Sequence, residues 1–234
     1  MTISDRYEDS VFINCPFDAE YRPMMRALMF AVYDCGFIVR SALEEDDAGE
    51  VRYTKILRII RECRFGIHDI SRVEIDRNTR LPRFNMALEL GLFLGAKGFG
   101  ETHHTAKSCL VLDRDPFRYR MSCSDIAGQE VRAHGNDRRK AITAVRDWLS
   151  NAPTRSGIII PSGSKIAERF EKFQDALPEW CEKQGLVTTE LTFRDERVLI
   201  EQWLQANVWT PPTPPSAMPP RAAVRRKRRD HVTH

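Results

Sequence analysis

The sequence predicts an α/β fold, in which a doubly wound parallel sheet with helices on both faces is followed by a helical appendage and a disordered tail. Short apolar runs alternate with amphipathic helical segments over residues 8–150, as expected for successive βαβ units. Residues 151–209 contain helical patterns alone. Residues 210–234 combine many prolines with a basic end, a composition typical of disorder. We therefore expect one large domain, a helical appendage and a tail.

The elements follow from the spacing of apolar residues along the chain. We expect strands over residues 10–14, 37–42, 65–70 and 108–113. We expect helices that begin near Tyr21 and Ile56, and further helices over residues 85–96, 137–149, 166–181 and 195–206, because apolar residues recur there at helical spacing. Gly36 is expected to end the first helix. Residues 117–133 fit either another strand or an irregular connection.

The composition is typical of a water-soluble globular protein, with 42% hydrophobic and 29% charged residues among 234. No apolar run approaches the roughly 18 residues of a membrane span, and the polar, acidic N-terminus does not resemble a signal peptide. The six cysteines form no Cys-x-x-Cys pair, which favours a reducing compartment without disulfides or zinc. We therefore expect a cytoplasmic protein with no membrane contact, no metal and no cofactor.

Positive charge is concentrated at the end of the chain. From Arg221 onward there are six basic residues and one acidic residue, Asp230, whereas the whole chain has a net charge of +3. The remaining residues therefore carry about −2, which is unlike a general nucleic-acid binder. The basic tail is either a solvated segment or an electrostatic contact with nucleic acid.

Polar side chains mark the carboxyl ends of the predicted strands. Asn14, Arg40, Asp69 and Asp113 all lie there, and ligands of doubly wound sheets bind at that edge. The helix that follows the third strand contains a lone carboxylate, Glu89, which is costly to bury without a partner or a chemical role.

Glu89 and Asn85 are four residues apart on this helix and share one of its faces. A carboxylate can attack the anomeric carbon of a sugar and expel a base. Asp69 would bring a second carboxylate into the same crevice. Each of these residues also has a structural alternative. Glu89 could pair with an arginine or cap backbone amides of its helix, Asp69 could form a turn or cap a helix, and Asn85 could cap the helix to which it belongs.

Three motifs resemble the nucleoside 2-deoxyribosyltransferase-like superfamily and its TIR-like nucleotide-binding relatives. They are Val11-Phe12-Ile13-Asn14-x-Pro16-Phe17 with Tyr21, then Asp69-Ile70-Ser71, and Asn85-Met86-x-x-Glu89-Leu90-Gly91. The resemblance covers about residues 10–115. It implies a flavodoxin-like sheet and cleavage of N-glycosidic bonds in nucleosides, nucleotides or NAD.

The resemblance also implies roles for individual residues. Glu89 matches the nucleophilic glutamate and Asp69 the strand-end aspartate, while Tyr21 and Phe17 resemble aromatic residues that help to close the site. Asn14, Pro16, Ser71, Arg72 and Asn85 would contact the substrate.

The chain departs from the deoxyribosyltransferases at Arg83, where these enzymes commonly have an acidic residue. An arginine suits phosphate, whereas an acid suits sugar hydroxyls. Arg72 and Arg80 lie in the same loop and have the same charge. The expected substrate is therefore a nucleotide or NAD. Such proteins often form homo-oligomers, and in bacteria they often act as effectors of antiviral defence, so that a regulatory partner protein is also expected.

Three functional hypotheses follow from the sequence. In the first, the protein is an N-glycosidase in which Glu89 attacks C1′ of the sugar. In the second, the same crevice senses a nucleotide or a nucleotide-derived signal without cleaving it. In the third, the chain is an interaction protein in which Glu89 is structural. The effect of Glu89→Gln on turnover, ligand binding and thermal stability distinguishes them.

Overall fold

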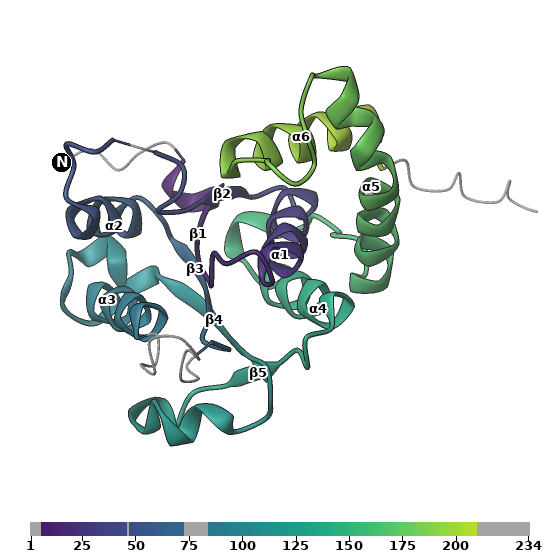
Figure 1. The fold of residues 1–234 in the computed structure, drawn as a ribbon. Coiled ribbons are helices and arrows are strands. Elements are labelled where there is room, and N and C mark those ends of the chain that lie inside the picture. The colour runs from purple at the N-terminus through teal and green to yellow at the C-terminus, as the bar shows by residue number, and fades with distance from the viewer. Residues whose placement is uncertain (1–5, 46, 73–83, 210–234) are drawn as a thin grey trace, which may run out of the picture.

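A five-stranded parallel sheet forms the centre of the molecule (Figure 1). The computed structural model describes residues 6–45, 47–72 and 84–209. The strands lie in the order β2-β1-β3-β4-β5, and every neighbouring pair is parallel. This order is that of a flavodoxin-like sheet, which confirms the predicted fold class. The strands are β1 Ser10–Asn14, β2 Ile38–Arg40, β3 Phe65–Asp69, β4 Ser108–Asp113 and β5 Val131–Ala133.

Helices cover both faces of the sheet. In the described part of the chain, α1 and α4 lie on one face and α2 and α3 on the other, while α5 and α6 pack outside α1 and α4 (Figure 1). The α-helices are α1 Arg22–Asp34, α2 Arg52–Arg61, α3 Asn85–Phe99, α4 Arg138–Leu149, α5 Gly163–Lys183 and α6 Phe193–Ala206. Short 3-10 helices cover Tyr7–Asp9, Thr102–Ala106, Arg118–Met121, Ser124–Ile126 and Pro153–Arg155.

Local sequence explains where several helices begin and end. Pro23 lies in the first turn of α1, where its missing N–H costs no hydrogen bond. Gly36 follows that helix with φ of 81°, a conformation that glycine adopts without strain. Asp137 accepts hydrogen bonds from the first free amides of α4, and Thr192 forms a reciprocal capping box with Asp195 at the start of α6.

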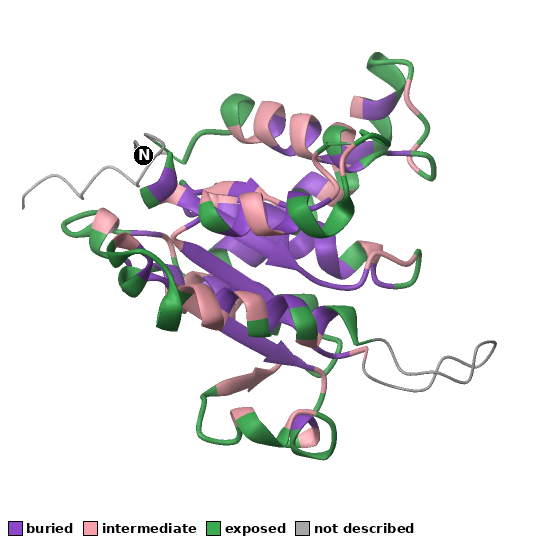
Figure 2. Cartoon of the chain, turned by 90° about the vertical axis from the view of Figure 1, so that its left-hand side faces the viewer, coloured by how far each residue is buried: buried purple, intermediate pink, exposed green. Residues whose placement is uncertain are grey.

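The central strands are enclosed between helical layers, as Figure 2 shows. Every residue of β1 and β3 is buried, which accounts for their nearly continuous apolar sequence. No helix in the described residues is both long and apolar enough to cross a membrane.

The helical appendage shares the main hydrophobic core with the sheet domain. Phe30 of α1 stacks on Phe173 of α5 with ring centroids 5.5 Å apart, and it also contacts Phe170 and Trp203. A buried, bidentate ion pair joins Arg26 of α1 to Glu196 of α6, with a shortest distance of 2.9 Å. The appendage is therefore packed on the sheet domain.

Lys107 is a buried cation in the opposite layer. Its Nζ donates hydrogen bonds to the carbonyl oxygens of Ile60, at 2.7 Å, and Cys63 at the end of α2. It also lies 4.7 Å from the centre of the Phe93 ring. Burial lowers the pKa of Lys107 to about 8, because desolvation disfavours the charged form. This side chain therefore joins the start of β4 to the end of α2.

Several element bounds differ from those expected: α2 begins at Arg52 and not near Ile56, β2 covers only Ile38–Arg40, and α3 extends to Phe99. Residues 117–133 contain both irregular structure and a strand, β5, which follows two short 3-10 helices. Helix α5 begins at Gly163, three residues before the expected start. Phe84 occupies the N-cap position of α3 and Asn85 is its first residue, which removes the structural alternative that Asn85 caps this helix. The expected tail over 210–234 lies outside the described residues.

Candidate functional site

Asp69 lies at the carboxyl end of β3 and connects three segments of the chain. Its side chain is fully buried. The Tyr21 hydroxyl, just before α1, donates to Asp69 Oδ2, and the backbone N–H of Ser71 donates to Oδ1 at 2.9 Å. Nε2 of His134, after β5, lies 3.1 Å from Oδ2. The bond to Ser71 is the turn-forming contact expected for an aspartate that ends a strand.

The Tyr21 hydroxyl is held as a neutral donor. Burial raises its pKa well above the ordinary value, and the neighbouring charge of Asp69 raises it further. Both effects disfavour the phenolate. The Tyr21–Asp69 contact therefore joins a protonated hydroxyl to a carboxylate.

The turn between β5 and α4 orients His134. Gly135 and Asn136 both have φ of 58°, and the backbone N–H of Asn136 donates to His134 Nδ1 at 3.0 Å. This bond assigns the ring proton to Nε2, the nitrogen nearest Asp69, although the ring is not aligned for a well-formed hydrogen bond to that carboxylate. Residues other than glycine adopt this left-handed conformation rarely, and asparagine is one of the few that do so more often.

Asn14 anchors the start of α3 to the end of β1. Its Nδ2 donates to the carbonyl oxygen of Met86 at 2.8 Å and lies 3.1 Å from Nδ1 of His68. Burial lowers the pKa of His68 to about 3, with a further contribution from Lys107, so the ring is neutral near pH 7. The role of Asn14 in this structure is to position the first turn of α3, which precedes Glu89.

Glu89 is the unusual carboxylate of α3. The residue is only 5% exposed, and its Oε2 has no hydrogen-bond partner among the described residues. Desolvation raises the pKa of Glu89 to about 7, although the charge of Arg52 on α2 opposes the shift. A buried carboxyl group that titrates near neutral pH is a common feature of functional sites.

The thiol of Cys15, the residue after β1, is affected by the charges of both carboxylates, Asp69 and Glu89. Burial raises the pKa of its thiol well above the ordinary value, and the charges of Asp69, Glu89 and Asp18 raise it further. Asp69 and Glu89 are therefore both close enough to the end of β1 to act on the same thiol. They reach it from different elements, β3 and α3.

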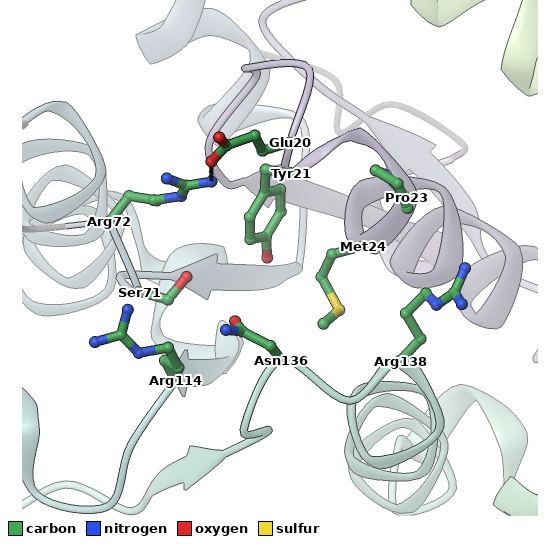
Figure 3. Close-up of a pocket in the computed structure, with 9 residues that line it drawn as sticks. All are labelled: Glu20, Tyr21, Pro23, Met24, Ser71, Arg72, Arg114, Asn136 and Arg138. Atoms are coloured by element: carbon green, nitrogen blue, oxygen red, sulfur yellow. Dashed lines mark hydrogen bonds and ion pairs between the residues drawn. The ribbon is translucent and has the colours of Figure 1, made fainter.

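A cavity of about 430 Å³ opens beside this edge of the sheet (Figure 3). Its volume falls in the range of small-molecule sites, roughly 300–1,000 Å³. It lies between the start of α1 and the segments that follow β3, β4 and β5. Glu89 and Asn85 are not among the residues that line it. Those residues are Glu20, Tyr21, Pro23, Met24, Ser71, Arg72, Arg114, Asn136 and Arg138.

The structure brings only part of the predicted site together. Tyr21, Ser71 and Arg72 line the cavity, and Arg72 forms ion pairs with Asp18 at 3.3 Å and Glu20 at 2.8 Å.

The other predicted residues in the described part of the chain are not among those that line the cavity. Pro16 is buried, Asn85 is exposed at the start of α3, and Phe17 packs half-buried against the main core. Arg83, which was expected to hold phosphate, lies outside the described residues, as does Arg80.

Sequence reasoning missed the residues that approach this edge after β4 and β5, namely Arg114, His134, Asn136 and Arg138, and also the lining residues Glu20, Pro23 and Met24 near the start of α1. Arg114 follows Asp113, whose position at a strand end was recognised. His134, Asn136 and Arg138 follow β5, which could not be separated from the irregular segment before it. A strand assigned to residues 131–133 would have placed the next residues at the carboxyl edge of the sheet, where ligands bind.

No group of three or more His, Cys, Asp or Glu side chains is placed to hold a metal ion in the part of the chain that the structure describes. Comparison of the chain with protein-family models, curated proteins and solved structures finds no match in any of the three.

Proposed function

We propose that this protein is an N-glycosidase that hydrolyses the bond between base and sugar in a nucleotide or NAD. The observation that supports the proposal most is the state of Glu89: nearly buried, with one oxygen unpartnered among the described residues, and with a pKa of about 7. About half of such a carboxyl group is ionised at neutral pH, and its negative charge is poorly solvated, which favours nucleophilic attack.

The proposed reaction has two steps. In the first, a Glu89 carboxylate oxygen forms a bond to C1′ while the N-glycosidic bond breaks, and the base leaves with the bonding electrons. A purine or pyrimidine base takes up a proton from water or a nearby donor, whereas the cationic nicotinamide of NAD becomes neutral on leaving and needs no proton. In the second, water attacks C1′, the ester bond to Glu89 breaks, and the carboxylate is restored. The sugar leaves with a hydroxyl at C1′.

The other polar groups of the edge act as positioning residues in this proposal. Both oxygens of Asp69 are already engaged, one with the Tyr21 hydroxyl and one with the Ser71 amide, so Asp69 is suited to fixing the loop after β3 and not to attack. Asn14 fixes the first turn of α3 through Met86, and thereby the direction in which Glu89 projects.

A base-release assay tests the proposal. Wild type, Glu89→Gln and the control Glu182→Gln, which alters an exposed carboxylate on α5, are incubated with NAD, ATP, dATP, GTP and deoxynucleosides. Free base is then measured by mass spectrometry. Release by wild type and the control, but not by Glu89→Gln, supports the mechanism. Equal release by all three proteins contradicts it.

A second candidate function is a nucleotide sensor that binds without cleaving. The observation in its favour is that the cavity is lined by three arginines but not by Glu89. In that case Glu89→Gln binds nucleotides as wild type does, and neither protein releases base at high enzyme concentration.

A further inference from the structure

The cavity beside Tyr21 is lined by arginines from the segments that follow three neighbouring strands, β3, β4 and β5. Arg72 follows β3, Arg114 follows β4, and Arg138 is the first residue of α4, after β5. Among the described residues that line the cavity, Glu20 is the only acidic one. Three guanidinium groups around one cavity repel each other unless negative charge lies near them.

Carboxylates already lie beside two of the three arginines. Arg72 pairs with Asp18 and Glu20, and Arg114 pairs with Asp115 at 2.8 Å. Asp113, at the end of β4, is already paired with Arg118. The balance among the lining residues stays positive, with three arginines and one carboxylate.

The first turn of α4 adds to the positive potential. It contains Arg138, Arg139 and Lys140 and no acidic residue, and its N-cap is Asp137. The N-terminal end of a helix is itself positive, so cations there are unfavourable and a bound anion is favourable. Arg139 is turned to Glu171 of α5, at 2.6 Å, whereas Arg138 lines the cavity.

Uncharged donors complete the lining. Figure 3 shows the amide group of Asn136 and the hydroxyl of Ser71 facing the space between Tyr21 and Arg114. Asn136 is held there by the left-handed turn that its N–H closes on His134. Guanidinium, amide and hydroxyl groups together are the donors that proteins use for phosphate oxygens.

We infer that this cavity binds the phosphate of a phosphorylated ligand, with Arg114 and Arg138 supplying charge and Asn136 and Ser71 supplying hydrogen bonds. The inference rests on the proposed function only for the rest of the ligand, and it assigns the phosphate of the proposed nucleotide or NAD to this cavity. The residues that line this phosphate site come from the start of α1, the start of α4 and the segments after β3, β4 and β5, and do not include Glu89 of α3.

Isothermal titration calorimetry with inorganic pyrophosphate, AMP and adenosine tests the inference. Wild type is expected to bind pyrophosphate and AMP, and to bind adenosine at least about tenfold more weakly, because charge-assisted hydrogen bonds are lost. Arg114→Gln and Arg138→Gln should each weaken AMP binding about tenfold. The matched control is Arg139→Gln, which removes the same charge from the same helical turn but outside the cavity, and it should leave affinity within about twofold.

Two results would overturn the inference: adenosine binding as tightly as AMP, or Arg139→Gln weakening binding as much as Arg138→Gln. Melting temperatures verify that the variants are folded. A further test uses wild type alone: the affinity for AMP should fall as the salt concentration rises. An affinity that is the same at low and high salt also contradicts the inference. If the protein binds phosphate but releases no base, the phosphate site stands and the proposed glycosidase activity is wrong. If it releases base equally from nucleosides and nucleotides, and Arg114→Gln does so unchanged, the glycosidase activity stands and the phosphate site is wrong.

Discussion

Replacing Glu89 with glutamine keeps the shape of the side chain but removes its charge, so the variant measures what the buried carboxylate costs the folded state. The pKa of Glu89 is about 7 in the folded protein, against an ordinary value of 4.5. Between these values the folded state binds more protons than the unfolded state, so the stability of wild type falls as the pH rises through this window. Glutamine does not ionise, so the stability of Glu89→Gln does not fall in this way.

The magnitude follows from the size of the shift. Each pKa unit corresponds to about 1.4 kcal/mol, so ionisation of Glu89 costs the folded state about 3 kcal/mol once the pH exceeds 8. Near pH 5 the cost is about 1 kcal/mol, because most of the group is still protonated in the folded protein. Glu89→Gln should therefore be more stable than wild type at pH 8.5, with a melting temperature higher by roughly 6–12 °C for a chain of this size.

Thermal unfolding followed by circular dichroism at pH 5 and pH 8.5 tests this prediction. Glu182→Gln is the control, since it removes an exposed carboxylate and should shift the melting temperature by little at either pH. A Glu89→Gln variant that is less stable than wild type at pH 8.5 would refute the reasoning. It would indicate that Glu89 is a structural residue whose charge is satisfied in the folded state.

Three further predictions concern stability and are measured by urea denaturation. Lys107→Ala should destabilise the protein by about 2–5 kcal/mol, because it removes hydrogen bonds to two buried carbonyl oxygens, of which that of Ile60 keeps the Cys63 N–H, and creates a cavity; a change below about 0.5 kcal/mol would contradict this. Arg26→Met should cost up to about 3–5 kcal/mol, since Glu196 is 1% exposed and would lose its bidentate partner, keeping the longer contact with Arg22 at 3.5 Å; a neutral outcome would count against that pairing. Gly91→Ala should stabilise α3 by about 0.5–1 kcal/mol, because its Cβ would meet no atom within 4 Å; a loss of stability would be inconsistent with open space at this position.

The sheet was predictable because its signals are local. The runs at 10–14 and 108–113 match β1 and β4 to the residue, since buried parallel strands are nearly continuous in apolar residues. β5 was not predictable in this way. It has three residues, all half-buried, at the edge of the sheet, so neither an apolar run nor a strict alternation marks it.

The candidate site was only partly predictable because its contacts depend on how distant segments meet. The sequence suggested that Asp69 and Tyr21 belong to one edge, and their side chains do touch. The sequence could not show that both oxygens of Asp69 would be engaged, or that His134 would approach from β5. These contacts join residues far apart in the chain, and no periodic pattern encodes them.

The most direct test of the central claim is the mass of the peptide that contains Glu89 after a rapid acid quench of wild type during base release. The proposed mechanism predicts a sugar residue covalently bound to Glu89, and no such adduct in Glu89→Gln. Base release with no adduct on Glu89, or with the adduct on Asp69, would contradict the assignment of Glu89 as the nucleophile.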